Sequence, residues 1–338
     1  GTSTDATAVS GGWKELGRTT LGSAGATISV TGLADKRYYM ILVDSLNSGL
    51  VSGFGRLNGD SGSNYSRRRS EDGGSDATNV NNVAMNYFGQ DVSGGHAFTV
   101  GYLANKSDKE KLSITHSVWG NTAGAGNAPH RMEDFGKWNN TTDPISSYQA
   151  VDLEGGDFAS GAECVVLGWD PDDTHTDNFW EQLASVNGDG TGGFSSGTFT
   201  AKKYLWVQTW VDPSASSRNL IRFNDDSSGS NGSTGNYSVR GSINGANNTL
   251  TSQTSIDSNH TVPLPKFFNM FIVNNSANEK LLIQQAAYVA NAGSSGTPQR
   301  TEIAGKWTNT SNQITKIDYI PHTGNYSTDS KMIVWGSN

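Results

Sequence analysis

The chain carries one module twice, and this internal duplication limits its fold more than any other feature of the sequence. A series of motifs recurs in the same order, with nearly the same spacing in both copies. The separation between Leu112 and Trp138, for example, equals the separation between Leu281 and Trp307. The matching motifs are WKEL and WEQL, KRYYMILVDS and KKYLWVQTWV, RLNGDSGSNYS and RFNDDSSGSNGSTGNYS, NKSDKEKLSI and NNSANEKLLI, GKWNNTT and GKWTNTS, and VVLG and IVWG. Each copy is therefore expected to fold into the same kind of domain.

The duplication divides the chain of 338 residues into two modules. A chain of this length is expected to form about two domains, each large enough to bury its own core. The short acidic segment DPDDTHTDNF separates the copies, and a linker of this length predicts that the modules touch. The expected parts are a polar arm over 1–11, module 1 over 12–170, an acidic linker over 171–179 and module 2 over 180–338.

Both modules have the sequence pattern of β structure. In ATISVTG, from Ala26, apolar Ile28 and Val30 alternate with polar residues, which is typical of a strand with one buried face. Runs such as YYMILV are apolar on both faces, as expected for a strand in the centre of a sandwich. Clusters of Gly, Ser, Asn and Asp supply turns between about nine or ten such runs in each copy. The sequence thus predicts an all-β protein with two tandem duplicated β-sandwich domains, each jelly-roll-like.

The composition argues against two classes of partner. The net charge is −8, whereas a nucleic-acid-binding protein needs a basic face. The basic run RRR is followed at once by Glu71 and Asp72, which indicates a solvated loop. No apolar stretch approaches the ~20 residues that span a bilayer, so no membrane insertion is expected. The single cysteine, Cys164, lies in an apolar run and is interpreted as a buried, inert thiol.

The repeated loop, which begins RLNG in module 1 and RFND in module 2, is the strongest candidate site. In one interpretation its Asn and Asp oxygens bind Ca²⁺. In the other interpretation these oxygens hydrogen-bond the backbone of a tight turn. The Arg then forms a bidentate ion pair with the carboxylate, and the Tyr side chain covers the sheet edge. The spacer is longer in module 2, which a turn tip tolerates better than a binding site does, so the structural interpretation is favoured. The shared residues are Arg56, Asn58, Asp60, Asn64, Tyr65 and Arg68 in module 1, and Arg222, Asn224, Asp226, Asn236, Tyr237 and Arg240 in module 2.

The repeated Gly-Lys-Trp motif is a second candidate. Its tryptophans would stack on a sugar ring if they were exposed, or anchor the two cores if they were buried. Their matched positions after a polar strand favour burial, with the neighbouring Lys137 and Lys306 pointing outward. The predicted core anchors are Trp138, Trp307, Leu112 and Leu281.

No catalytic motif is recognisable in the sequence. The 6 histidines show no metal-binding spacing, and neither a Gly-x-Ser-x-Gly elbow nor a phosphate-binding Gly-x-x-x-x-Gly-Lys-Ser/Thr loop occurs. Glu110 and Glu279 both precede Lys-Leu in a duplicated motif, which favours structural roles. We therefore expect a non-enzymatic protein with no catalytic residue, no metal and no cofactor. Four linker carboxylates are interpreted as solvated, with weak Ca²⁺ binding as the alternative: Asp170, Asp172, Asp173 and Asp177.

The duplicated sandwich and the sequence RLNGDSGSNY, from Arg56 to Tyr65, resemble β-rich virion proteins of tailed phages, especially aquatic ones. Fibre, decoration and head-surface proteins of that kind often carry an FNGDTGSNY-like loop. Module 2 departs from the pattern, because Asp225 stands where module 1 has Gly59. The resemblance implies a bacteriophage structural protein on the virion surface, or one that is otherwise extracellular. The tandem architecture is also similar to that of double jelly-roll capsid proteins.

These features lead to one expected function and, besides the double jelly-roll capsid protein as one alternative, two others. The expected function is a virion structural protein, a capsid decoration or tail-fibre component that assembles with itself, for instance as a trimer, or with other virion proteins. The first alternative is an extracellular lectin-like protein that binds a host-surface glycan, which exposed Trp or Tyr side chains clustered on one face would favour. The second is a glycan depolymerase, which would need paired carboxylates across a cleft in one module.

Overall fold

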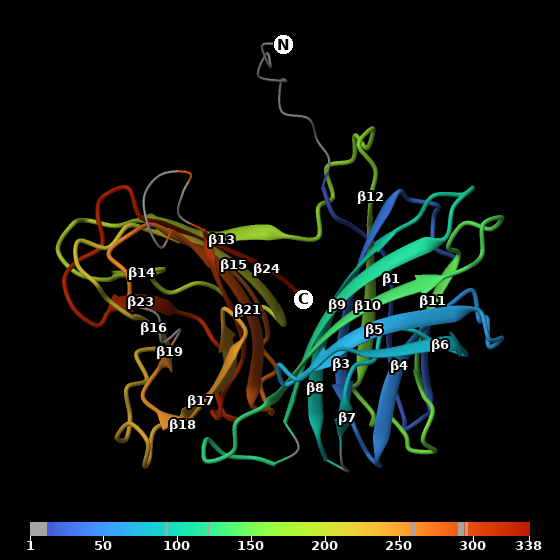
Figure 1. Cartoon of the computed structure of the whole chain (residues 1–338), viewed down its shortest axis with the longest axis horizontal. Coiled ribbons are helices and arrows are strands. Elements are labelled where there is room, and N and C mark those ends of the chain that lie inside the picture. The colour runs from blue at the N-terminus through green and yellow to red at the C-terminus, as the bar shows by residue number, and fades with distance from the viewer. Residues whose placement is uncertain (1–11, 92–93, 121, 258–260, 290–293, 295–296) are drawn as a thin grey trace.

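The computed structural model describes residues 12–91, 94–120, 122–257, 261–289, 294 and 297–338. These residues form strands and loops, and Figure 1 shows them as two sandwich-like bodies joined by one connecting segment. No helix occurs among them, and hence none that could span a bilayer. The polar arm expected over 1–11 lies outside the described residues.

Module 1 consists of two antiparallel sheets. One has eight strands in the order β1-β12-β3-β8-β9-β10-β5-β6, and the other has four in the order β2-β11-β4-β7. The strands are β1 (Lys14–Thr20), β2 (Thr27–Thr31), β3 (Tyr38–Leu46), β4 (Val51–Leu57), β5 (Tyr65–Glu71), β6 (Ala77–Asn82), β7 (Gln90–Asp91), β8 (His96–Ala104), β9 (Lys111–Gly120), β10 (His130–Trp138), β11 (Ser147–Asp152) and β12 (Glu163–Trp169).

Module 2 repeats this arrangement strand for strand. Its eight-stranded sheet has the order β13-β24-β15-β20-β21-β22-β17-β18, and its four-stranded sheet has the order β14-β23-β16-β19. The strands are β13 (Glu181–Asn187), β14 (Phe194–Ser195), β15 (Tyr204–Val211), β16 (Asn219–Phe223), β17 (Tyr237–Ile243), β18 (Ala246–Gln253), β19 (Ile256–Asp257), β20 (Lys266–Val273), β21 (Lys280–Tyr288), β22 (Gln299–Trp307), β23 (Ile317–Pro321) and β24 (Lys331–Ser337).

Both modules have the topology of a jelly roll. When the hairpins β5–β6 and β9–β10 are set aside, the eight remaining strands of module 1, counted along the chain, pair as 1-8-3-6 and 2-7-4-5. This is the pairing of two interlocked Greek keys. The two hairpins then extend the larger sheet beyond β8. The predicted fold class of two tandem duplicated β-sandwiches is confirmed.

The described residues contain more strands than the sequence suggested, because each module contributes twelve. The additional strands are very short or polar: β7 and β19 have 2 residues each, and β6 has the sequence ATNVNN. Such segments lack the alternation of apolar and polar residues on which the prediction depended. The RRR run, expected in a loop, lies within β5, where the guanidinium carbon of Arg67 is 4.7 Å from the centroid of the Phe54 ring.

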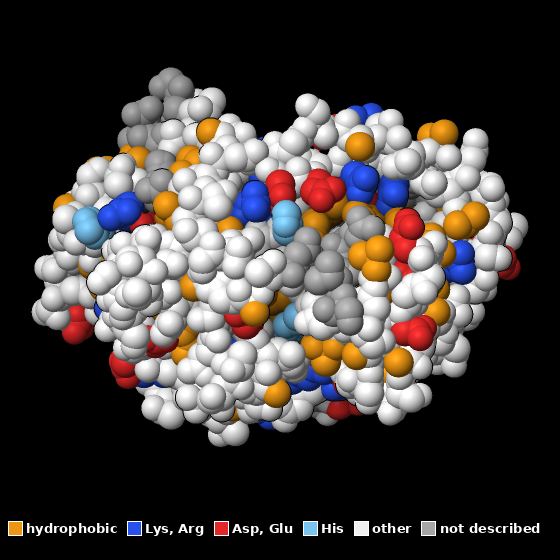
Figure 2. Space-filling model, turned by 90° about the horizontal axis from the view of Figure 1, so that it is seen from below, with side chains coloured by type: hydrophobic (Ala, Val, Ile, Leu, Met, Phe, Trp, Pro, Cys, Tyr) orange, Lys and Arg blue, Asp and Glu red, His pale blue; other side chains and the backbone are white. Residues whose placement is uncertain are grey.

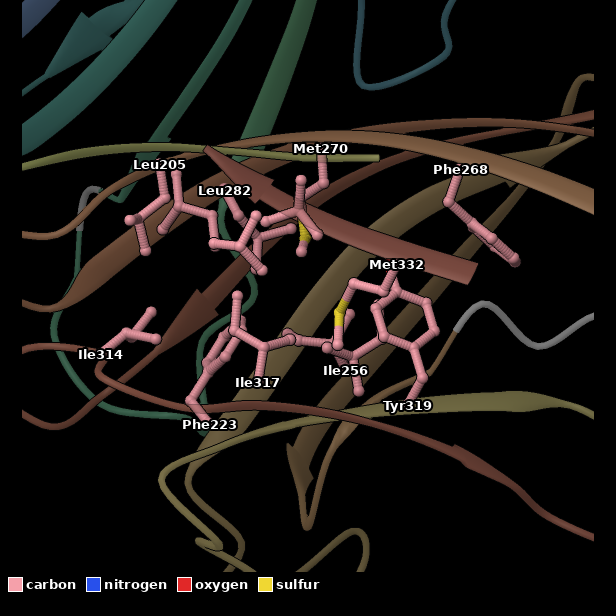
Figure 3. Close-up of a cluster of buried hydrophobic side chains, with 14 of the residues drawn as sticks. Leu205, Phe223, Ile256, Phe268, Met270, Leu282, Ile314, Ile317, Tyr319 and Met332 are labelled. Atoms are coloured by element: carbon pink, nitrogen blue, oxygen red, sulfur yellow. The ribbon is translucent and has the colours of Figure 1, made fainter. Parts of the chain in front are cut away.

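A hydrophobic core fills each sandwich. In module 2, Figure 3 shows Leu205, Met270 and Leu282 of the larger sheet opposite Phe223 and Ile317 of the smaller sheet. All of these side chains are buried. Burial of a side chain of this size contributes roughly 1.5–3 kcal/mol. Each module therefore has a core of its own.

A third cluster of buried apolar side chains lies between the modules, where the outer faces of the two eight-stranded sheets meet (Figure 1). Strand β3 shows how this arises. Its Ile41 and Val43 pack in the core of module 1, whereas Met40 and Leu42 belong to the cluster shared with module 2. The run YYMILV is thus apolar on both faces because it has a core on both faces.

The acidic linker lies against module 1 rather than standing free in solvent. The ammonium group of Lys36 pairs with Asp173 and lies 3.6 Å from Asp170 Oδ2. Lys14 Nζ lies 2.8 Å from Asp177 Oδ2. The interpretation as solvated was wrong for Asp173, whose side chain is 12% exposed and paired with Lys36, whereas Asp177 is 64% exposed and stays solvated beside Lys14. Their pairing orients the linker at the point where it leaves β12.

The surface of the molecule is dominated by uncharged polar groups. Figure 2 shows a mostly white face on which hydrophobic side chains form small separate groups, while charged side chains of both signs and a histidine lie together near the middle. Charged residues make up only 17% of the chain. On such a surface, a contiguous exposed apolar patch marks an interaction site more clearly than charge does.

Candidate functional site

The repeated loop of module 1 is a closed hydrogen-bonded turn. Trp138 Nε1 donates to Asp60 Oδ2 over 2.7 Å, and Asn64 Nδ2 donates to the same oxygen over 2.9 Å. The Tyr65 hydroxyl accepts from the Leu57 backbone N–H at 3.1 Å and donates to the Asp60 carbonyl at 3.1 Å. Burial alone would raise the pKa of Asp60, but the hydrogen bond from Trp138 and its neighbours holds that pKa below its usual value.

The loop of module 2 has the same contacts despite its longer tip. Trp307 Nε1 donates to Asp226 Oδ2 at 2.7 Å, and Asn236 Nδ2 donates to it at 2.9 Å. The Tyr237 hydroxyl accepts from the Phe223 N–H at 3.0 Å and donates to the Asp226 carbonyl at 3.1 Å. In both copies the Tyr and Trp rings stack with centroids 6.3 Å apart. The extra residues of the tip lie outside this network.

The first Asn of each loop fixes the entry into the turn. Asn58 and Asn224 have φ values of 52° and 53°, a left-handed conformation that Asn tolerates better than most residues. The side-chain oxygen of Asn58 accepts from the Ser146 N–H at 2.8 Å, and that of Asn224 accepts from the Thr315 N–H at 2.9 Å. Each Asn therefore ties its loop to the segment that precedes the next strand of the smaller sheet.

The arginines of the loops do not fork to the carboxylates, so that detail of the prediction was wrong. Arg56 Nε donates to the Val83 carbonyl at 2.9 Å, and Arg222 Nε donates to the Thr254 carbonyl at 3.2 Å. Trp and Asn side chains already satisfy the carboxylate, which leaves the arginines free to bind backbone.

The second arginine of the motif has a different partner in each module. Arg68 pairs with Asp76 at 3.1 Å on the surface of module 1. Its counterpart Arg240 reaches across to module 1, where Nε donates to the Pro129 carbonyl at 2.9 Å. Sequence identity at this position therefore does not imply the same contact.

The geometry of the loops favours the structural interpretation over a Ca²⁺ site. N–H donors already occupy the carboxylate oxygens of Asp60 and Asp226 that a metal ion would need. Within the described parts of the chain, no group of three or more His, Cys, Asp or Glu side chains is placed to hold a metal ion.

Three of the four predicted core anchors are buried, and one is not. Trp138, Trp307 and Leu281 are each 1% exposed, whereas Leu112 is 57% exposed. Leu112 and Leu281 follow the first residues of β9 and β21, and both lie on the outer face of an eight-stranded sheet. Module 1 covers that face of module 2, so Leu281 is buried between the modules, but nothing in the described structure covers Leu112.

The lysines beside the two tryptophans differ in the same way. The side chain of Lys137 is 44% exposed and pairs with Glu110 at 3.0 Å. Lys306 pairs with Glu279 at 3.0 Å but is fully buried, because it also donates to the Thr122 carbonyl of module 1 at 2.8 Å. The prediction that Lys306 points outward was therefore wrong, since a loop of the other module covers it.

A pocket of about 470 Å³ lies on the outer face of the larger sheet of module 1, beside Leu112. Its wall is built of aromatic and aliphatic side chains, and we refer to it as the aromatic pocket. Tyr38 and Trp169 stack with centroids 5.6 Å apart, and Trp13 lies 6.4 Å from both Trp169 and Tyr102. The side chains that define it are Trp13, Tyr38, Tyr102, Leu112, Ile114 and Trp169.

The aromatic pocket remains open to solvent although its residues are apolar. Tyr38 is 36% exposed, Leu112 57% and Ile114 46%. The register β12–β3–β8–β9 places Trp169, Tyr38, Ala104 and Leu112 in one row across the sheet. An exposed apolar row of this kind is typical of an interaction surface.

The corresponding row of module 2 is buried in the contact between the modules. Tyr204 and Leu281 occupy the positions of Tyr38 and Leu112, and they are 0% and 1% exposed. The Tyr204 ring stacks on Phe98 of module 1 with centroids 6.2 Å apart. Sequence reasoning interpreted the run YYMILV, which contains Tyr38, as a strand in the centre of a sandwich and so missed the pocket. The pairing of Trp13 with Trp180 and of Tyr38 with Tyr204 in the duplication was the signal that marked them as one repeated surface.

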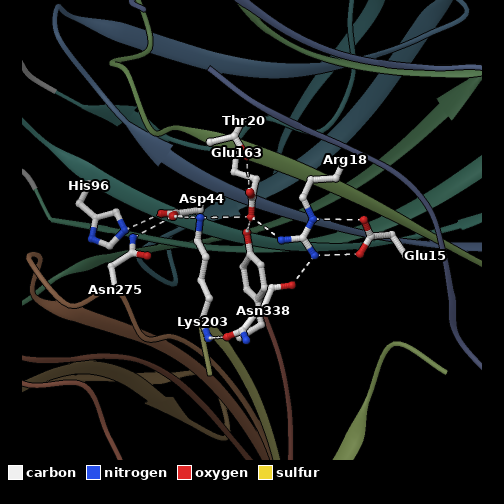
Figure 4. A network of polar contacts seen from close by, with 10 residues as sticks. Glu15, Arg18, Thr20, Asp44, His96, Glu163, Lys203, Asn275 and Asn338 are labelled. Atoms are coloured by element: carbon white, nitrogen blue, oxygen red, sulfur yellow. Dashed lines mark hydrogen bonds and ion pairs between the residues drawn. The ribbon is translucent and has the colours of Figure 1, made fainter. Parts of the chain in front are cut away.

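A buried polar network accompanies the contact between the modules (Figure 4). Asp44 Oδ1 lies 2.8 Å from His96 Nε2, and Asp44 Oδ2 lies 3.0 Å from Lys203 Nζ of module 2. Lys203 Nζ is also 3.1 Å from Glu163 Oε1, which accepts from the Tyr204 hydroxyl at 2.8 Å. Burial alone would raise the pKa of Asp44, but its bonds to His96 and the charge of Lys203 lower that pKa to about 2.

A second ionic cluster joins the hairpins β9–β10 and β21–β22. Arg131 pairs with Glu133 on its own strand and lies 3.1 Å from Glu302 Oε2 of module 2. Nearby, Gln285 Nε2 lies 3.0 Å from His116 Nε2. Burial raises the pKa of Glu133 to about 7, even though the Arg131 charge opposes this shift.

Raising the pH from about 4.5 to about 7 is expected to destabilise the wild type relative to a Glu133→Gln variant by about 1–3 kcal/mol. The raised pKa means that the folded protein holds the Glu133 proton more tightly than the unfolded chain does. The free energy of unfolding therefore falls across this window, whereas Gln cannot ionise. Urea unfolding of both proteins at several pH values measures the difference. Parallel pH profiles would contradict this assignment.

Comparisons with known proteins give no family for this chain. No family model matches it, and no curated protein matches its sequence. Among solved structures, domains LG4-5 of the mouse laminin alpha1 chain align over 97% of this chain and 92% of theirs, with 7% identity and a TM-score of 0.18. Neisserial surface protein A aligns over 84% and 97%, with 7% identity and a TM-score of 0.13. Ail of Yersinia pestis aligns over 81% and 99%, with 5% identity and a TM-score of 0.13. These scores are too low for a shared fold to be concluded.

Proposed function

We propose that this chain is a non-enzymatic structural protein that assembles through the aromatic pocket of module 1. The observation that carries the proposal is the contrast between the two copies. The same row of residues is buried by a protein contact in module 2 and exposed in module 1. The aromatic pocket therefore lies at the position that, in the other copy of the module, already contacts protein within this molecule.

The setting that we propose for this assembly is a virion surface, as a capsid decoration or tail-fibre component. The sequence RLNGDSGSNY of the first loop supports this setting through its resemblance to tailed-phage proteins. The closed hydrogen-bonded turn and the low density of charge are compatible with a particle that must persist outside cells.

A lectin-like function is the second candidate, and the stacked rings of Tyr38 and Trp169 favour it. A sugar site needs polar partners beside the ring on which the sugar stacks. None of the residues that line the aromatic pocket carries a carboxylate, amide or guanidinium group. The pocket chemistry therefore fits an apolar protein surface better than a glycan.

Size exclusion with light scattering over a range of concentrations is expected to show that the wild type self-associates, whereas a Leu112→Lys variant remains monomeric. The charged side chain would have to be desolvated inside the contact, and this should weaken association at least about tenfold. Leu50→Lys is the matched control, because Leu50 is 48% exposed and does not line the pocket. A wild type that is monomeric at every concentration would refute the proposed function, and glycan binding would then be the next hypothesis to test.

A further inference from the structure

The contact between the modules pairs equivalent strands, as where His116 meets its counterpart Gln285, but one end of the contact is asymmetric. That end joins two different surfaces, which we name the docking face and the receiving face. The docking face belongs to module 2 and is centred on Lys203 and Tyr204. The receiving face belongs to module 1 and consists of Asp44, Phe98 and Glu163, which lie in one row across the sheet. Because the modules are copies, each of them has a counterpart of both faces.

The two faces that this contact does not use are both exposed. The docking face of module 1 is the aromatic pocket. In module 2, Lys331 of β24, Trp210 of β15 and Phe267 of β20 correspond to Glu163, Asp44 and Phe98 of module 1. These three residues form the receiving face of module 2. Trp210 is 37% exposed and Phe267 is 44% exposed. The chain therefore exposes two faces that correspond to the two sides of its internal contact: the docking face of module 1 and the receiving face of module 2.

We propose that a second copy of this chain occupies the aromatic pocket, and that it does so with the Trp210–Phe267 face of its module 2. This inference rests on the proposed function and specifies its partner. Tyr38 of one chain then packs on Phe267 of the next, as Tyr204 packs on Phe98 within a chain. The contact is heterologous, so repeating it gives a closed ring or an open filament rather than a two-fold dimer.

Charge makes this contact weaker than its internal counterpart. Within the chain, Lys203 faces Asp44 and Glu163. Between chains, Arg37, which precedes Tyr38 as Lys203 precedes Tyr204, would face Lys331. Two like charges replace an ion pair, so the association should be reversible and should strengthen as salt screens the repulsion. A Lys331→Glu variant should restore an opposite charge and tighten the association at least about tenfold.

Complementary variants test the pairing of the two faces. Leu112→Lys blocks the docking face of module 1, and Phe267→Lys blocks the receiving face of module 2; both positions are exposed, so the folds should survive. Each variant alone should be monomeric by light scattering. An equimolar mixture should give a discrete heterodimer, because each variant keeps the half that the other has lost.

The outcomes separate this inference from the proposed function. If the wild type associates but Phe267→Lys associates equally well, the aromatic pocket pairs with another surface, and the head-to-tail contact is refuted while assembly stands. If both variants are monomeric but their mixture also stays monomeric, the two faces do not bind each other, and the inference is again refuted. If the wild type itself never associates, the proposed function fails first. Circular dichroism and thermal melting of each variant confirm that the fold is intact before these results are read.

Discussion

Replacing Trp307 with Ala is expected to lower the free energy of unfolding by about 3–5 kcal/mol. The indole is 1% exposed and lies in the core of module 2, stacked on Tyr237. Its removal leaves a cavity between two sheets whose strands are fixed by their ladders, so the core can collapse only in part. It also removes the N–H that Asp226 accepts at 2.7 Å. Denaturant unfolding followed by circular dichroism measures the loss.

A milder variant separates the two contributions. Trp307→Phe keeps most of the apolar contact but removes one of the two side-chain donors to Asp226 and leaves Asn236 in place. It should therefore cost about 1–3 kcal/mol, the value of a hydrogen bond to a partly buried charged group. The matched variants Trp138→Ala and Trp138→Phe should give the same order in module 1, because Asp60 has the same bond there. Trp307→Ala would contradict the role of a core anchor if it cost less than about 1 kcal/mol.

The duplication and the alternation of residues were enough to predict the sandwich architecture. Each strand with a period of two needs one covered face, and two copies of the pattern require two copies of the fold. The repeated Trp residues are buried as predicted, and each donates to the repeated Asp at 2.7 Å, which favours the structural interpretation of both residues. What such reasoning finds is the part of the structure that both copies share.

The same reasoning could not find what differs between the copies. Leu112 and Leu281 stand in the same motif, and only the position of the other module makes one exposed and one buried. Asp44 shows the same limit from the polar side. In the sequence it is an acidic residue near the end of an apolar strand, which would ordinarily be solvated, yet it is 0% exposed because module 2 covers it. Contacts between domains depend on the complementarity of two folded surfaces. The periodicity of residues within a strand contains no information about that complementarity.

Replacing Asp44 with Ala is the second large effect, expected to destabilise the contact between the modules by about 3–5 kcal/mol. The substitution leaves His96 and Lys203 without the carboxylate that they share, and Lys203 stays largely buried. Lys203 then keeps only Glu163 as a counter-charge, and the donors of His96 and Asn275 lose an acceptor that lies 2.8 Å from each of them. Several buried donors that lose one shared carboxylate cost far more together than a single exposed ion pair. The exposed pair Arg68–Asp76 supplies the control, since Asp76→Asn should change stability by no more than about 0.5 kcal/mol.

The distinguishing result of Asp44→Ala is a change in cooperativity as well as in stability. Each module has its own core, so weakening the contact between them should split one unfolding transition into two. The wild type should lose part of this stabilisation in acid. Because the pKa of Asp44 is lowered to about 2 from 3.8, its contribution is present in full above about pH 4 and disappears as the pH falls toward 2, whereas the variant has no such contribution to lose. If Asp44→Ala unfolded in a single transition with unchanged stability, the network of Asp44, Glu163 and Lys203 would not hold the modules together, and the apolar cluster between them would have to do so alone.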